Sequence, residues 1–367
     1  MIPTGAVLPS SAKTDVPYMP MPRKSPFLDM TNLYNRVGEA EECAEMLVNN
    51  PEAHALFEAQ LAYRRGEIDK VYDKARYFLS SHSGFYAILG GGMLLALCAI
   101  WRGDIQLWNE AKKHICQAPC QSEQERECIS LALAIIDSSV YDNKDYPEWF
   151  RAGNFEKLPF DSHPAAKVFY IKYLYMEAFA IASKQIQMEG VSGLAMMKLI
   201  THIIEPLITQ AVVDGTVIPE IYLRLSCAVA YHNSGQSEKA IAHVDIAIAK
   251  ALPDRLYGVL TEYIRHFDGL LEDRIAAVDG EALQSILELN RIYRVGWSRL
   301  SGQVRNKYIA TNLTPREHEI AKLSAFGFGV KEIASMLYVS ESTIKQTIAR
   351  VINKSGIQDK SEFSYIL

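Results

Sequence analysis

The chain has 367 residues, of which 49% are hydrophobic and 22% are charged, and its formal net charge is −5. This length allows two or three domains, and the composition is that of a soluble globular protein. The net charge excludes a polycation, so any affinity for nucleic acid must come from a local basic surface.

Residues 1–31 are rich in proline and predict an unstructured arm. They lack the charged start and the apolar core of a secretory signal. The six cysteines of the chain show no paired framework, which fits a reducing compartment. We therefore expect a cytoplasmic protein.

Residues 83–101 contain no charged side chain, and their length is close to that of a membrane span. However, Gly90, Gly91 and Gly92 interrupt the stretch, and Arg102-Gly-Asp104 follows it in a pattern that recurs elsewhere. A buried helix of a helical array accounts for these features better than a membrane segment, which stays the alternative. We expect no membrane partner.

Residues 32–303 show helical periodicity and no convincing strand pattern, so the expected fold class is all-α. Prolines and glycines punctuate this region. The expected helical segments are residues 52–65, 68–79, 94–102, 124–138, 165–184 and 193–212, and the punctuating prolines are Pro119, Pro147, Pro159, Pro164, Pro206 and Pro219.

Several of these segments look like repeats, because each ends in a glycine before another helix begins. Gly66, Gly103 and Gly235 hold these positions. The copy around Gly235 resembles a tetratricopeptide repeat, which places small or aromatic residues at the positions of Ala228, Tyr231, Ala240 and Ala247. Val71 and Phe78 stand where that repeat has Ala. We therefore expect a degenerate tetratricopeptide-like array over residues 53–275, with an irregular helical bundle as the alternative.

Stacked helix pairs expose a concave surface that suits a peptide, a protein helix or a small molecule. We therefore expect the array to receive a small-molecule or protein effector, whose identity the sequence does not give. Tyr170, Tyr173 and Tyr175 are candidates for a pocket lining. Aromatic residues at helical spacing more often belong to a core, and we favour that interpretation.

A connecting helix is expected over residues 282–307, followed by a domain boundary within residues 302–312. Its last part is basic and contains no acid, with Arg291, Arg294, Arg299, Arg305 and Lys307. Two interpretations stay open. The helix pairs two copies of the protein or contacts phosphates, or it docks on the array and keeps a solvated basic face.

Three helices are predicted next. Thr314-Pro-Arg-Glu317 combines a capping Thr, a Pro at the first helical position and a Glu three residues after the cap, and Gly327 ends this helix. Residues 331–338 form a second helix, and Ser340 caps a third over residues 340–354. Two short helices joined by so tight a turn are typical of a helix-turn-helix. A fourth short helix is expected over residues 360–366.

The helix over residues 340–354 has one apolar stripe, formed by Ile344, Ile348, Val351 and Ile352. Its other face is polar and basic, and donors of this kind reach base edges and phosphates in a DNA major groove. Residues 313–367 carry seven Lys or Arg against six Asp or Glu. Tight binding therefore needs two such domains acting together.

Residues 313–367 resemble the LuxR/NarL-type DNA-binding domain without a gap. The residues that carry the resemblance are Leu313-Thr-Pro-Arg-Glu317, Glu319-Ile320, Gly327, Lys331-Glu-Ile-Ala334, Leu337, Ser340-Glu341, Thr343-Ile-Lys345, Lys354 and Gly356. The resemblance implies a four-helix domain that binds double-stranded DNA as a homodimer.

By position, the resemblance assigns base reading to Lys345, Gln346 and Ala349. It assigns backbone contact to Thr343, Thr347 and Lys354, and we expect further backbone contacts from Lys331, Arg350 and Lys360. Four residues depart from the usual pattern of the family, namely Gly329, Thr347, Ser355 and Lys360. A specific target sequence therefore does not follow.

Other sites are not apparent. The sequence contains no Gly-x-x-x-x-Gly-Lys phosphate loop, no receiver-like run of acids and no catalytic constellation, so we expect no enzyme and no cofactor. His114, Cys116, Cys120 and Cys128 are the one cluster that suggests a metal or a thiol sensor. Their spacing matches no common zinc pattern, so buried structural thiols are favoured and no metal is predicted.

The predicted organisation is an arm over residues 1–31, a signal or interaction domain over 32–281, a connection over 282–312 and a DNA-binding domain over 313–367. The expected function is promoter binding by a transcriptional regulator that is controlled through its array. The alternative is a helical scaffold that captures proteins or peptides and contacts DNA secondarily. Activation or repression is not predictable.

Overall fold

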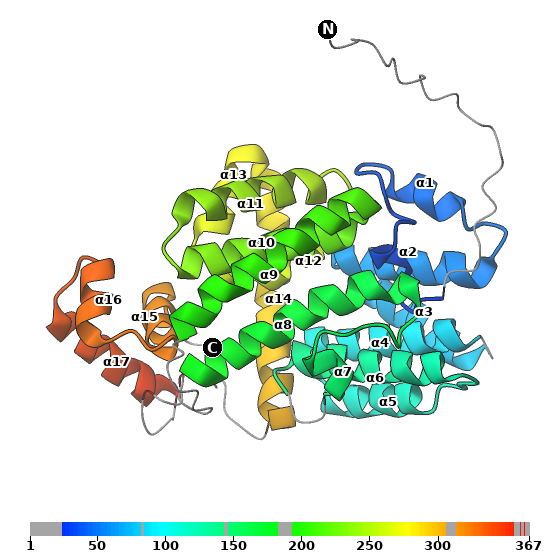
Figure 1. Cartoon of the computed structure of the whole chain (residues 1–367), viewed down its shortest axis with the longest axis horizontal. Coiled ribbons are helices and arrows are strands. Elements are labelled where there is room, and N and C mark those ends of the chain that lie inside the picture. Colours follow the sequence, from blue (N-terminus) through cyan, green and yellow to red (C-terminus); the bar gives the residue numbers. More distant parts are fainter. Residues whose placement is uncertain are drawn as a thin grey trace, which may run out of the picture.

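The structure is a computed structural model that describes residues 24–81, 84–142, 146–182, 193–305, 313–355, 360 and 363. Every regular element among these residues is a helix, which confirms the expected all-α class. Figure 1 shows a large body of packed helices, with a small group formed by α15, α16 and α17 at one end.

The helices of the large body agree with most of the expected segments. They are η1 (Leu28–Met30), α1 (Ala40–Glu45), α2 (Pro51–Arg65), α3 (Ile68–Ser80), α4 (Phe85–Arg102), α5 (Ile105–Cys116), α6 (Glu123–Ser139), α7 (Glu148–Arg151), η2 (Phe160–Ser162), α8 (His163–Ala182), α9 (Gly193–Asp214), α10 (Val217–Asn233), α11 (Ser237–Ala251), α12 (Tyr257–Tyr263), η3 (Ile264–His266), α13 (Leu270–Val278) and α14 (Gly280–Arg305). Pro206 lies inside α9 and does not interrupt it, contrary to expectation.

Helix α4 runs through the glycine triplet that was expected to interrupt it. Each missing side chain makes room for a neighbouring helix, because a Cβ atom at Gly90, Gly91 or Gly92 would lie within 2.9 Å of a side-chain carbon from α2, α3 or α5. Two helical stretches, Phe85–Arg102 and Ala195–Asp214, are long and apolar enough to cross a membrane. The first is 78% buried inside the protein, as a core helix is, and the second is 33% buried.

The large body closes on itself. In an open solenoid each repeat contacts only its neighbours. Here α14 packs against α4 and α12 as well as α13, and α2 packs against α12. Figure 1 shows α14 passing behind the middle of the body. The array therefore covers part of its own inner surface, and its tetratricopeptide-like character stays a prediction.

The amino-terminal arm was expected to be unstructured through residue 31, and this is wrong for residues 24–31. Asp29 is buried and accepts a hydrogen bond from Arg64 Nε at 2.6 Å. Phe27, Leu28 and Met30 belong to the main core. Apolar side chains and a paired buried carboxylate hold this segment against α2 despite its proline content. Residues 1–23 lie outside the described part.

The connecting helix begins two residues earlier than expected and is docked along its length. Its Trp297 donates a hydrogen bond to Ser139 O at 2.8 Å, and Trp101 of α4 packs edge-on against Tyr293 at 5.0 Å. Arg291 pairs with Glu288 on the exposed side. This arrangement is the docked alternative of the two interpretations. The expected boundary falls largely on residues 306–312, outside the described part.

Candidate nucleic-acid interface

The small group consists of α15 (Pro315–Ala325), α16 (Val330–Met336) and α17 (Glu341–Ser355). Thr314 Oγ1 accepts from Glu317 N at 3.3 Å, and the Glu317 carboxylate accepts from Thr314 N at 2.8 Å. This is the predicted capping box, which satisfies two free donors of the first turn. The expected fourth helix lies outside the described part, except that Lys360 is exposed and Phe363 is fully buried in the small core.

A tight turn joins α16 to α17. Val339 N donates to Ala334 O at 3.0 Å, which closes the end of α16. Tyr338 has φ 53°, a left-handed conformation that reverses the chain, and its side chain is 96% exposed. Ser340 Oγ then accepts from Thr343 N at 3.1 Å and caps α17, as predicted. The turn orients the two helices as in a helix-turn-helix.

The two faces of α17 separate as the sequence predicts. Ile344, Ile348 and Val351 are buried in the small core together with Ile320 and Ile333. Lys345, Gln346 and Ala349, the three candidates for base reading, are exposed on the opposite side. These three side chains are therefore available to a major groove, and their role in base reading stays a prediction.

The candidates for phosphate contact divide into two groups. Lys331, Thr343, Arg350 and Lys360 are exposed. Thr347 is only 6% exposed, and its hydroxyl donates to Thr343 O at 2.9 Å, so its hydrogen is used inside the helix. Lys354 is partly buried and donates to Glu317 at 2.7 Å.

Glu317 is a buried anion that the sequence analysis treated only as a cap. Its side chain is 2% exposed, with Lys354 at 2.7 Å and Arg350 at 3.7 Å. Burial alone would raise the pKa of this carboxyl, but hydrogen bonds from Lys354 and Thr314 outweigh burial and hold the pKa below its ordinary value. The carboxylate therefore fixes the last turn of α17 to the first turn of α15.

A second ionic cluster joins the small group to the array. Asp268, between η3 and α13, has His232 Nε2 at 3.4 Å, Lys322 Nζ at 3.7 Å and His318 Nδ1 at 3.9 Å. Lys322 also donates to His266 O at 2.8 Å. Since His318 and Lys322 belong to α15, the contact fixes the helix-turn-helix against the array.

A cavity of about 70 Å³ lies beside this junction. Its wall comes from α6, α8, α10, α12, η3 and α14, and Lys322 of α15 also lines it. Arg265 stacks over the Trp297 ring at 4.0 Å, and Lys172 adds a second cation. Tyr175 also lines it, while Tyr170 and Tyr173 pack in an aromatic cluster around Phe150, as a core role predicts.

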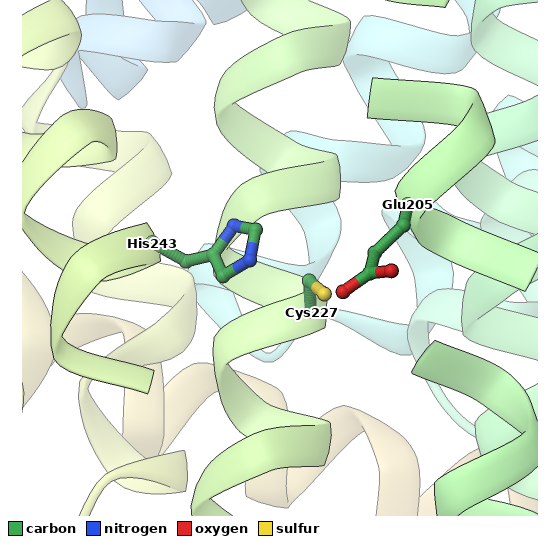
Figure 2. Close-up of side chains that lie close together, drawn as sticks. All are labelled: Glu205, Cys227 and His243. Carbon is green, nitrogen blue, oxygen red and sulfur yellow. The ribbon is translucent and has the colours of Figure 1, made fainter. Parts of the chain in front are cut away.

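Buried structural thiols were expected for Cys116, Cys120 and Cys128, and this is correct for Cys128 but wrong for the other two. Cys116 is exposed, Cys120 is partly exposed and Cys128 is buried. Among the described residues, the one group of three or more possible metal ligands is Glu205, Cys227 and His243, whose spacing matches no familiar motif (Figure 2).

Comparison with known proteins agrees with the geometry. Residues 311–365 match the family of bacterial regulatory proteins of the luxR type. The "Uncharacterized transcriptional regulatory protein YxjL" of Bacillus subtilis is 30% identical over 137 residues, which cover 31% of this chain and 62% of the relative. The "Transcriptional regulatory protein LnrK" of the same organism is 35% identical over 51 residues, which cover 14% of this chain and 23% of the relative.

The chain thus spans less than two thirds of either relative. The matched residues include α15, α16 and α17, and with them the capping box, the tight turn and the two-faced last helix. The chain therefore carries, at residues 311–365, a LuxR-type helix-turn-helix domain of the luxR family of bacterial regulatory proteins.

Proposed function

We propose that the protein is a cytoplasmic transcriptional regulator that binds promoter DNA as a homodimer through α17. The observation that carries the proposal is the exposure of Lys345, Gln346 and Ala349 on a helix whose other face is buried. In this proposal these three residues read bases. Lys331, Thr343 and Arg350 hold phosphates.

Two further candidates for phosphate contact have limited freedom. The Lys354 ammonium is already paired with Glu317, so it acts on DNA mainly by its charge. The Thr347 hydroxyl donates its hydrogen to Thr343 O, so it can only accept a further hydrogen bond. An ionised phosphate has no hydrogen to donate to it. Lys360 is exposed and keeps its proposed role.

We infer that the signal reaches the protein at the junction cavity. Lys172, Arg265 and Lys322 line this cavity against a single carboxylate, Glu262, and Trp297 and Tyr263 give it flat aromatic walls. Such a lining suits a small anionic effector with an unsaturated or aromatic part. Because Lys322 belongs to α15, an effector there would contact the array and the helix-turn-helix at the same time.

Selection of bound sequences from random DNA with the full chain tests the DNA-binding proposal. The expected result is an enriched site with two related halves, as a dimer requires. Lys345→Ala is expected to weaken binding to that site by about 1–3 kcal/mol and to relax one base position. Lys113→Ala, an exposed lysine of α5, is the matched control for loss of one charge and is expected to bind like wild type. Failure to enrich any sequence would contradict the proposal.

A further inference from the structure

Three consecutive helices of the array bring three different ligand types together. Glu205 comes from α9, Cys227 from α10 and His243 from α11, and their ligand atoms all lie within 4.8 Å of one another. Figure 2 shows the carboxylate, the thiol and the imidazole converging between the helices. The thiol is buried, the imidazole is partly buried and the glutamate is exposed.

Tyr231 organises two of the three side chains. Its hydroxyl donates a hydrogen bond to Glu205 Oε1, and its ring stacks on the His243 imidazole with 5.7 Å between the centroids. Lys239 Nζ lies 4.8 Å from the centroid of the same tyrosine ring. Supporting contacts of this kind orient the ligands in metal sites. The hydroxyl uses one carboxylate oxygen and leaves Oε2 for another partner.

His243 contributes a partly buried imidazole ring to the cluster. Its Nδ1 atom is buried and has no hydrogen-bond partner among the described residues. In Figure 2, Nδ1 lies on the side of the ring away from Cys227 and Glu205, and Nε2 is the nitrogen that faces them. Nε2 is therefore the ligand atom that His243 offers to the cluster.

We propose that Glu205, Cys227 and His243 form a binding site for one divalent transition metal ion of the zinc class. Sulfur, imidazole nitrogen and carboxylate oxygen are the donors that Zn²⁺ takes in proteins, and a site with three protein ligands keeps its fourth position for water. The exposed side of Glu205 lets that water reach the ion.

Binding changes one bond in the protein. The Cys227 Sγ–H bond breaks, its proton passes to solvent, and the sulfur lone pair forms the bond to the metal without any change of oxidation state. The ion would tie α9, α10 and α11 together. Helix α10 also carries Ser226, Val229 and Asn233, which line the junction cavity, so the site stiffens one wall of that cavity.

The proposal is tested on the full chain, stripped with a chelator and titrated with Zn²⁺ against a competing indicator. We expect one equivalent of Zn²⁺ to bind. Cys227→Ser and His243→Gln are each expected to lower the affinity for Zn²⁺ by at least about tenfold. Loss of a residue that only supports a ligand already costs about tenfold, so loss of a ligand itself should cost at least as much. Cys98→Ser is the matched control, because burial raises the pKa of both thiols to about 12.

Co²⁺ gives a second readout that a general loss of stability does not reproduce. The wild-type chain and Cys98→Ser are expected to show the charge-transfer absorption of a thiolate bound to Co²⁺, and His243→Gln a weaker or shifted form of it. Cys227→Ser should lack this absorption while its thermal unfolding stays cooperative. Failure of the wild-type chain to bind Zn²⁺, or equal binding by wild type, Cys227→Ser and His243→Gln, overturns the proposal. None of these outcomes depends on DNA binding.

Discussion

Lys322 of α15 and Asp268 of the array form an ion pair across the junction of the two parts of the chain, with 3.7 Å between Nζ and Oδ2. The Lys322 side chain is 5% exposed and that of Asp268 is 18% exposed. Since buried charges are stable only when they are paired, this contact should contribute to the docking of the helix-turn-helix on the array.

Asp268→Asn is therefore expected to destabilise the protein by about 3 kcal/mol, the lower end of the range for a buried ion pair that loses one partner. Asparagine is the suitable replacement because Asp268 has φ 50°, a conformation that asparagine tolerates. The free energy of unfolding in urea measures the effect. Asp245→Asn, which removes the partner of Arg274 on the exposed surface, is the control and should change little. Equal effects of the two variants would show that the junction pair is not stabilising.

Acid is expected to weaken the same junction. Burial, with Arg265 and Lys322 nearby, holds the pKa of His266 well below its ordinary value, and burial also lowers that of His318. A free histidine has a pKa of about 6.5, so below that pH the unfolded chain binds protons that the folded chain does not, and stability falls.

Each such histidine contributes a loss of at most about 1.4 kcal/mol per pH unit. His266 also accepts a hydrogen bond from Arg265 Nε at 3.3 Å, which only the neutral ring can do. In His266→Gln, the decrease in unfolding free energy from about pH 6.5 to about pH 5 should be smaller than in wild type. An unchanged dependence on pH would contradict the assigned role of His266. The lowered pKa of Asp268 matters only at lower pH, because a free aspartate titrates near 3.9.

Lys331 and Lys354 should separate DNA binding from stability. Lys331 is exposed, so Lys331→Ala is expected to weaken binding to all sequences alike, lower the salt dependence by about one ion and leave unfolding unchanged. Lys354→Ala removes the 2.7 Å partner of the buried Glu317 carboxylate. This variant should lower the unfolding free energy of the small group of α15, α16 and α17 by about 1–3 kcal/mol. Salt titrations of DNA binding and urea unfolding measure both effects, and unchanged stability in Lys354→Ala would count against the Glu317 contact.

The helix-turn-helix could be predicted because its signals are local. The capping pair Thr314 and Glu317 lies three residues apart, and the stripe of Ile344, Ile348 and Val351 repeats within one helix. Side-chain spacing along a helix determines which face is buried, so the exposure of Lys345 follows from sequence alone.

The remaining features depend on contacts between distant residues, which a single sequence does not encode in any pattern. Lys322 and His266 are 56 positions apart and Lys354 and Glu317 are 37 apart. The same limit explains the misjudged glycine triplet of α4. Glycine weakens an isolated helix by its entropy, but at Gly91 it fits the packing, because Phe78 of α3 occupies the space where a side chain would lie.

Gly296 of α14 gives the sharpest test of the closed array. A Cβ atom at this position would lie 2.0 Å from Trp101 O and 2.4 Å from Trp101 C, which are backbone atoms of α4. Backbone atoms cannot rotate away as a side chain can, so Gly296→Ala must separate α14 from α4 and disturb the packing of Trp101 on Tyr293. We expect a loss of about 3 kcal/mol or more, at or above the upper end of the usual cost of overpacking.

Gly280→Ala is the matched control, because a Cβ atom there meets nothing within 4 Å. It is expected to leave stability unchanged or raise it by up to about 1 kcal/mol, since alanine loses less entropy than glycine on folding. Thermal and urea unfolding of the two variants measure the difference. If Gly296→Ala unfolded like Gly280→Ala, α14 would not cross α4 at this distance. The closed arrangement that brings Trp297 and Lys322 to one cavity would then be wrong.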